Sequence, residues 1–180
     1  MRLMSRLVVI LLTGLTLLSS GCGYALAGRG NALPDTIRRI GLPTFENHSN
    51  TPDLDRVLTE AVRQEFQGKG HFTIVQETSG VDAVLSGTVA PVRISVAALT
   101  QGRQAQRYLI TVEASVEFKD VKGNKVLWSN PNLRVSDEYD VTGTVAVNDP
   151  AAIFSQDQNA LNRLAKSFAR TLVASILEAF

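Results

Sequence analysis

Few side chains in this sequence could perform chemistry. Its only cysteine is Cys22, and its two histidines, His48 and His71, stand apart from each other and from the cysteine. Catalysis needs a nucleophile, an acid–base pair or a metal held in one site, and neither histidine has the HxxxH or HxxE spacing of a metal-binding motif. Both histidines fit ordinary polar positions, one in a loop and one at the start of a strand. We therefore expect no enzyme, no catalytic residue, and no cofactor or metal site.

A basic stretch is the second chemical feature. Residues 83–112 contain no acidic side chain, yet Arg93, Arg103 and Arg107 lie among them. Arg93 and Arg107 are out of phase with the apolar residues of their expected strands, and a turn centred near Thr100 would place them opposite each other. Like charges directly across a strand pair are destabilising, and arginine binds phosphate through two parallel hydrogen bonds. The three arginines are either an anion-binding site or a solubilising hairpin tip.

Cys22 follows a segment with the layout of an export signal. Arg2 and Arg6 precede a largely apolar stretch of twelve residues, Leu7 to Leu18. A transmembrane helix needs about 20 apolar residues to cross the hydrocarbon core, so this stretch fits the shorter apolar region of a cleaved signal peptide. We expect residues 1–21 to be that signal peptide.

The residues before the cysteine indicate its modification. Leu18-Ser19-Ser20-Gly21-Cys22 resembles a bacterial lipobox, in which the thiol receives diacylglycerol and the new amino terminus is acylated. A lone thiol in an exported chain otherwise lacks an explanation, and several acyl chains anchor a protein firmly where one holds marginally. Gly23 replaces the aspartate that retains proteobacterial lipoproteins in the inner membrane, so by resemblance we expect the outer membrane. Residues 22–36 are then a lipidated tether before a single domain, residues 37–180.

Composition limits what that domain can be. The 180 residues are 44% hydrophobic and 19% charged, which is typical of a globular protein and excludes a wholly disordered chain. Eighteen basic and 17 acidic side chains give a net charge of +1, and removal of the signal peptide leaves 16 and 17. This balance argues against a nucleic-acid-binding surface.

Two helices are predicted from apolar residues at helical spacing. The first follows Thr51, which we expect to be its N-cap, and ends at Gly68 or Gly70. The second begins with the similar pair Asp149-Pro150 and runs almost to Phe180. Its buried side chains should be Leu161, Leu164, Ala165, Phe168, Leu172 and Ile176.

Strands fill the remainder of the domain. The clearest runs from Tyr108 to Phe118, with even-numbered side chains buried and odd-numbered ones exposed. Further strands are expected over residues 37–42, over 71–76, from 82 with a change of phase at Pro91, and over 126–135 with a break at Pro131; residues 137–147 read as irregular. Together with the helices they indicate an α+β two-layer sandwich, with two helices on one face of a mostly antiparallel, mixed sheet of four to five strands.

The mature chain carries short motifs in a distinctive order. They are Gly21-Cys22-Gly23-Tyr24-Ala25-Leu26, Leu33-Pro34, Pro43-Thr44-Phe45-Glu46-Asn47, Pro52-Asp53-Leu54, Leu58-Thr59-Glu60-Ala61 and Asp82-Ala83-Val84-Leu85-Ser86-Gly87-Thr88-Val89. A turn at Gly102 leading to Tyr108 completes the series. In order and spacing, these motifs resemble the LptE family, the lipopolysaccharide-assembly lipoproteins.

The resemblance implies partners and a role. LptE proteins plug the lumen of the LptD outer-membrane β-barrel, aid its assembly and handle lipopolysaccharide, and their lipid anchor holds them in the outer membrane on the periplasmic or barrel-lumen side. Family members present a basic hairpin tip to the glycolipid, and Arg103 beside Gly102 occupies the comparable position. One alternative stays open, a structural envelope-assembly adaptor that binds no glycolipid.

The anchor is tested by Cys22→Ser. We expect this variant to remain as an uncleaved precursor or to appear in the soluble periplasmic fraction, because serine has no thiol to receive diacylglycerol. Fractionation and the mass of the mature protein measure both outcomes. A serine variant that is processed and still behaves as a membrane lipoprotein would show that Cys22 is not the anchor.

Overall fold

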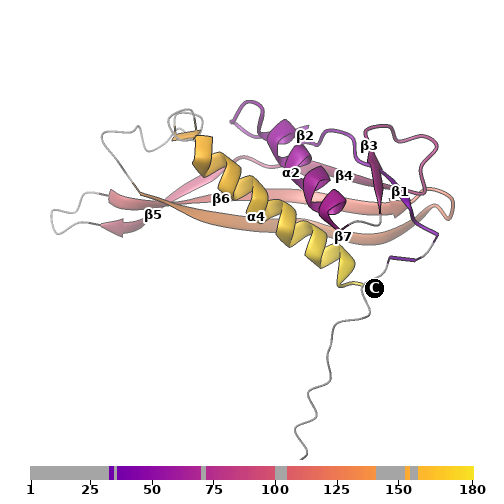
Figure 1. The fold of residues 1–180 in the computed structure, drawn as a ribbon. Coiled ribbons are helices and arrows are strands. Elements are labelled where there is room, and N and C mark those ends of the chain that lie inside the picture. Colours follow the sequence, from indigo (N-terminus) through magenta and orange to yellow (C-terminus); the bar gives the residue numbers. More distant parts are fainter. Residues whose placement is uncertain (1–32, 35, 70–71, 100–104, 141–152, 155–157) are drawn as a thin grey trace, which may run out of the picture. The chain divides into compact units, whose positions relative to one another are not determined.

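The computed structural model describes residues 33–34, 36–69, 72–99, 105–140, 153–154 and 158–180. Residues Asn31–Phe180 form one compact unit. Along the chain its elements are β1 (Arg39–Gly41), β2 (Glu46–Asn47), α2 (Leu54–Gly68), β3 (Thr73–Val75), β4 (Ala83–Val89), β5 (Arg93–Leu99), β6 (Ala105–Asp120), β7 (Lys125–Asp140) and α4 (Gln158–Leu177) (Figure 1).

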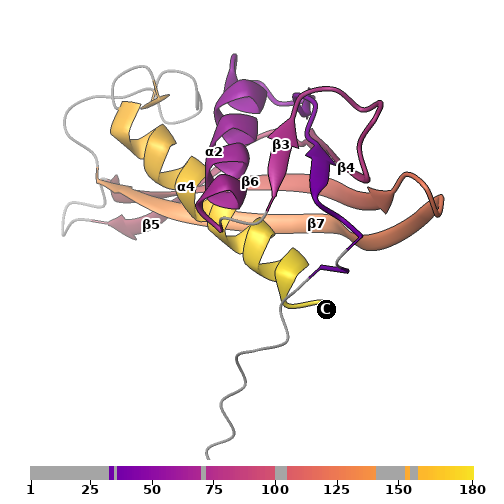
Figure 2. The ribbon, with the colours of Figure 1, turned by 45° about the vertical axis from the view of Figure 1, so that its right-hand side comes forward.

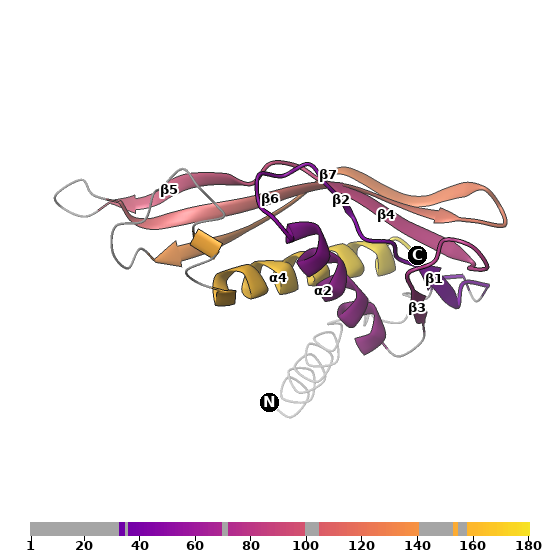
Figure 3. The ribbon, with the colours of Figure 1, turned by 90° about the horizontal axis from the view of Figure 1, so that it is seen from above.

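The two helices lie on one face of a single mixed sheet, as the view from above shows (Figure 3). Helix α4 packs on β7, α2 contacts β2 and β3, and the two helices pack against each other. This arrangement confirms the predicted α+β sandwich.

Strand β6 organises the sheet. It pairs antiparallel with β7 along one edge, and with β4 and then β5 along the other. Strands β1 and β2 both pair parallel with β4, and β3 lies parallel beside β1 (Figure 2). The sheet is therefore mixed, with the antiparallel part centred on β6.

The strand count is higher than predicted, because the described residues form seven strands and not four to five. The seven strands occupy only five rows. Strands β1 and β2 share one edge of β4, with Pro43 between them, and β4 and β5 share one edge of β6, with Pro91 between them. A proline has no N–H to give to a ladder, so each of these rows is interrupted at its proline and divides into two strands.

The predicted alternation in β6 is confirmed. The buried side chains on its helix-facing side are Tyr108, Ile110, Val112, Ala114, Val116 and Phe118. Ser115 and Glu117 lie exposed on the opposite face, which we call the outer face. The predicted stripe of α4, from Leu161 to Ile176, is likewise buried in the same core. Each such large apolar side chain contributes about 1.5–3 kcal/mol by leaving water.

Strand β7 departs from the prediction, because it does not break at Pro131. Near this residue β7 places two residues, Pro131 and Asn132, opposite the single residue Ser115 of β6. Such a bulge leaves one residue unpaired, so the missing N–H of proline costs no ladder bond. The strand then continues to Asp140, and residues 137–140, which we expected to be irregular, belong to it.

The helix ends agree only in part with the sequence prediction. Helix α2 ends at Gly68 as predicted, but its N-cap is Asp53 and not Thr51. Asp53 adopts a left-handed backbone conformation with φ of 59°, which aspartate tolerates better than most residues, and the helix starts two residues later than predicted. Helix α4 is described from Gln158, and the predicted start at Asp149-Pro150 lies outside the described residues.

A buried phenylalanine joins the two layers. The Phe45 ring meets the Phe168 ring of α4 edge to face, with centroids 6.4 Å apart, and the Phe45 N–H donates to Thr59 Oγ1 of α2 at 3.0 Å. A side chain at Gly87 would lie 3.2 Å from the Phe45 ring. Gly87 therefore makes room for Phe45 between sheet and helices, which gives a packing reason for three of the sequence motifs.

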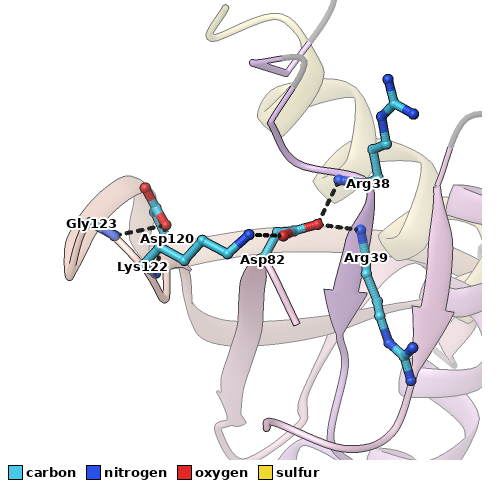
Figure 4. A network of polar contacts seen from close by, with 6 residues as sticks. All are labelled: Arg38, Arg39, Asp82, Asp120, Lys122 and Gly123. Atoms are coloured by element: carbon cyan, nitrogen blue, oxygen red, sulfur yellow. Dashed lines mark hydrogen bonds and ion pairs between the residues drawn. The ribbon is translucent and has the colours of Figure 1, made fainter. Parts of the chain in front are cut away.

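Asp82 connects β1 to the hairpin between β6 and β7 through hydrogen bonds. Its Oδ2 accepts hydrogen bonds from the backbone N–H groups of Arg38 and Arg39, at 3.1 and 2.9 Å. Its Oδ1 accepts one from Lys122 Nζ, in the turn between β6 and β7, at 2.8 Å (Figure 4). The Lys122 hydrogen bond first, and the two backbone donors next, hold the pKa of Asp82 well below its ordinary value.

Asp82→Asn should lower the free energy of unfolding at pH 7. An asparagine keeps one acceptor oxygen but turns an NH2 group toward either the backbone donors or Lys122. Because the folded-state pKa of Asp82 is depressed, its stabilising effect is present above its unfolded pKa and is lost as pH falls. The difference in free energy of unfolding between wild type and variant should therefore be largest above about pH 5 and shrink below about pH 4.

Urea denaturation at pH 7 and pH 3 of protein lacking residues 1–22 measures this effect. Glu178→Gln, at an exposed position near the carboxyl end, removes the same charge and should change little. A difference for Asp82→Asn that is equal at both pH values would contradict the assigned role of the carboxylate.

Candidate functional site

The predicted anion site falls on the hairpin formed by β5 and β6. Arg93 is the first residue of β5, and Arg107 lies near the start of β6. Residues 100–104 connect the two strands, and Arg103 among them lies outside the described residues, as does Cys22. The hairpin extends past the first turn of α4, at the end of the sheet away from the C-terminus (Figure 3).

The predicted register of this hairpin is wrong. Arg93 pairs with Thr111 and Arg107 pairs with Ala98, so the hairpin centres near Gly102 and not near Thr100. Both arginines lie on the outer face of the sheet, as expected. Thr111, which lies opposite Arg93, is four positions after Arg107 along β6, or about 13 Å away, so the cross-strand repulsion that we expected between the arginines does not arise.

Arg107 is instead matched by two carboxylates of β7. Its Nη1 donates to Glu138 Oε2 at 2.8 Å and its Nε donates to Asp140 Oδ1 at 2.9 Å. The Asp140 hydrogen bond and charge, followed by those of Glu138, raise the pKa of Arg107 above its ordinary value. All three side chains are substantially exposed, so solvent screens the attraction.

Arg93 is also paired, through a glutamate of β6 that serves two cations. Glu113 Oε2 lies 3.5 Å from Arg93 Nη2, and its Oε1 lies 2.7 Å from Arg134 Nη2 of β7. The Glu113 side chain is only 13% exposed, whereas Arg93 is 70% exposed. The outer face near the hairpin thus carries three arginines and three carboxylates in contact.

Sequence reasoning missed these acids because it ended β7 too early. Once residues 137–140 are in strand, Glu138 lies opposite Leu109, and Asp140 lies opposite Arg107. Asp137 alternates to the helix side, where its Oδ2 accepts from Arg163 Nε of α4 at 3.2 Å. The sequence did contain a signal for the longer strand. Apolar side chains at Leu133, Val135 and Tyr139 alternate with polar or charged ones at Arg134, Ser136, Glu138 and Asp140.

The balance of charge therefore differs along the hairpin. Arg93 and Arg107 are each neutralised in place, and an anionic ligand would have to compete with their carboxylates. The connecting sequence Thr100-Gln101-Gly102-Arg103-Gln104 contains one cation and no acid. Within the predicted set, Arg93 and Arg107 have carboxylate partners in the described structure, whereas Arg103 lies outside the described residues.

A hollow lies on the outer face, where β2 meets β4. This hollow of about 410 Å³ is lined by Pro43, Thr44, Glu46, Ser86, Gly87, Thr88, Ser115 and Glu117. Its hydroxyls and two carboxylates offer acceptors without a cation, which does not suit an anion. The part of the chain that the structure describes has no group of three or more His, Cys, Asp or Glu side chains that could hold a metal, and neither of its helices is both long and apolar enough to cross a membrane.

The elements that form this fold coincide with a known family. The family model LptE, described as Lipopolysaccharide-assembly, matches residues 37–176. The chain belongs to the LptE family. The LptE match begins just before β1 and ends one residue before the end of α4, so it spans the whole two-layer domain. It confirms the resemblance drawn from the short motifs.

Two solved structures, from Nitrosomonas europaea and Chlamydia trachomatis, agree with the fold. The solution structure of an uncharacterized lipoprotein B from Nitrosomonas europaea has a TM-score of 0.50 at 13% identity, covering 86% of this chain and 90% of its own. A hypothetical protein from Chlamydia trachomatis has a TM-score of 0.51 at 8% identity, covering 78% and 95%. Rare lipoprotein B from Shewanella oneidensis gives 0.46 at 13% identity, covering 77% and 96%. No curated protein matches the sequence.

Proposed function

We propose that this protein is an outer-membrane lipoprotein, anchored through lipid on Cys22, that assists assembly of an LptD-type β-barrel and plugs its lumen. In that position it helps to deliver lipopolysaccharide to the outer leaflet, and it performs no catalysis. The observation that carries the proposal is the LptE match over residues 37–176. The export signal that ends at the lone cysteine supports the location.

The length of β6 supports the plug. Sixteen residues of strand extend over about 50 Å, whereas the hydrocarbon core of a bilayer is about 30 Å thick. Ile40 of β1 pairs with Ala83, which pairs with Asp120 at the far end of β6. The tether therefore joins the domain beside the Asp120 end of β6, and Arg103 comes just before the other end in sequence, because β6 begins at Ala105. A domain lying along a barrel lumen could reach from the anchored leaflet to the opposite one.

Glycolipid binding is assigned to the hairpin tip, with Arg103 as its main residue. A glycolipid phosphate offers the oxygens that an arginine fork binds with two hydrogen bonds. Arg93 and Arg107 support it less directly, because Glu113, Glu138 and Asp140 already contact them. Their role is to hold the hairpin and to exchange partners when an anion arrives.

A structural adaptor without glycolipid binding is the second candidate. The observation in its favour is the same set of ion pairs, because a neutralised outer face attracts anions weakly. The two candidates differ in whether the purified protein retains lipopolysaccharide. Both candidates, as assembly factors, are expected to bind the barrel.

Arg103→Glu should weaken lipopolysaccharide retention by the purified protein at least tenfold, because one fork of charge-assisted hydrogen bonds is lost and a repulsive charge is added. Arg107→Gln should have a smaller effect. Arg170→Glu, at an exposed position of α4, gives the same change of charge as Arg103→Glu and should bind as wild type. Circular dichroism controls for folding.

Equal retention by Arg103→Glu and Arg170→Glu would favour the adaptor. A pull-down from detergent-solubilised outer membrane then tests the assembly role separately. Recovery of a large β-barrel in near-equal amount supports the plug, and recovery of the protein alone contradicts it.

A further inference from the structure

The opposite end of β6 carries a surface of different chemistry. We call Lys119, Val121, Lys122, Lys125 and Val126 the basic turn; they lie in and beside the hairpin between β6 and β7. Val121 is 43% exposed and Val126 is 44% exposed, which places them among the four most exposed large hydrophobic residues that the structure describes. An apolar side chain at the tip of a polar hairpin contributes nothing to the core.

The acids at this end are largely committed to the backbone. Asp120 Oδ1 accepts from the N–H groups of Lys122 and Gly123 at 2.9 and 3.0 Å, which shapes the turn (Figure 4). Asp82 holds the first strand and Lys122 together.

The positive charges exceed these acids. Three lysines belong to the basic turn, and Arg38 and Arg39 lie exposed beside Asp82. Residues 38–39, 82 and 119–126 together contain these five cations and two carboxylates, Asp82 and Asp120. The excess of charge within this set is positive, although the chain as a whole carries a net charge of only +1.

The chain reaches its domain at the same place. Asp82 binds the backbone of Arg38 and the amine of Lys122 at once, and Arg38 follows Cys22 by only sixteen residues. If Cys22 is lipidated as in the proposed function, on which this step rests, a tether of at most about 55 Å holds the basic turn within reach of the headgroups of the anchored leaflet.

We propose that the basic turn docks on a bilayer surface rich in anionic phospholipid. The lysines lie at headgroup level, where each basic residue near an anionic surface strengthens binding about fivefold, and the two valines insert between headgroups. Membrane binding by one weak signal is marginal and becomes stable when a second is added. Docking would place the Asp120 end of β6 at the headgroups, so that the strand points away from the anchored leaflet. The hairpin between β5 and β6 would then be at the end of the domain remote from that leaflet.

The test uses non-lipidated protein that lacks residues 1–22, because the compact unit begins at Asn31. Its sedimentation is measured with vesicles of phosphatidylethanolamine, with and without phosphatidylglycerol, at low and at high salt. Neither lipopolysaccharide nor a barrel is present, so the result is independent of the proposed function. We expect binding only to the phosphatidylglycerol vesicles, with loss at high salt.

Two variants and one matched control complete the experiment. Lys119→Gln with Lys125→Gln should weaken binding about 30-fold and leaves the Lys122–Asp82 pair intact. Val121→Ser with Val126→Ser should weaken it several-fold without any change of charge. Lys166→Gln with Arg170→Gln removes the same charge from the exposed side of α4 and should bind within about threefold of wild type.

Three outcomes would overturn the proposal. The first is no binding of wild type to phosphatidylglycerol vesicles. The second is an equal loss in the lysine variant and the α4 control, which would indicate only net charge. The third is unchanged vesicle binding in the lysine variant together with loss of barrel co-purification, which would make the basic turn a protein-binding surface.

Discussion

The structure depends on one strand, β6, being paired along both of its edges. Strand β7 pairs with one edge from Arg107 to Asp120, and β4 and β5 divide the other at Pro91. The register of every other strand is therefore set directly or indirectly by β6. Because its even-numbered side chains are all buried from Tyr108 to Phe118, a slip of one residue would turn that apolar row to solvent. The same strand separates the two ends of the domain, the Arg103 hairpin and the basic turn.

The spacing of apolar residues predicted the strands and helices that bury only one of their faces. The alternation of β6, the stripe of α4 and the end of α2 at Gly68 all follow from apolar spacing and a helix terminator. What periodicity could not predict was where prolines would be tolerated. Pro131 sits in a bulge of a continuous strand, whereas Pro91 divides a row into two strands. The difference depends on the facing strand, because a bulge needs a partner that can place one residue opposite two.

The candidate site was harder to predict than the fold. The alternation of apolar and polar residues along the strands predicts that Arg93 and Arg107 lie on the outer face, and they do. Their partners do not follow from phase, because Glu113, Glu138 and Asp140 reach them only through the β5–β6 and β6–β7 registers. The pairing of β5 with β6 centres the hairpin near Gly102 on both sides of the irregularity between Val96 and Leu99, so that irregularity does not explain the offset from Thr100. The motif residues Phe45, Thr59 and Gly87 proved to be packing contacts between layers, so a family resemblance carried by them reports fold more directly than ligand binding.

The central claim is that the two ends of β6 do different work, with lipopolysaccharide handled at the β5–β6 hairpin and the anchored leaflet contacted at the basic turn. Photo-cross-linking in living cells tests it directly, with a photoreactive residue placed at exposed Ala97 of β5 or at exposed Val121. The account predicts lipopolysaccharide adducts from position 97 and none from position 121. Adducts in equal amount from both positions, or from position 121 alone, would contradict it.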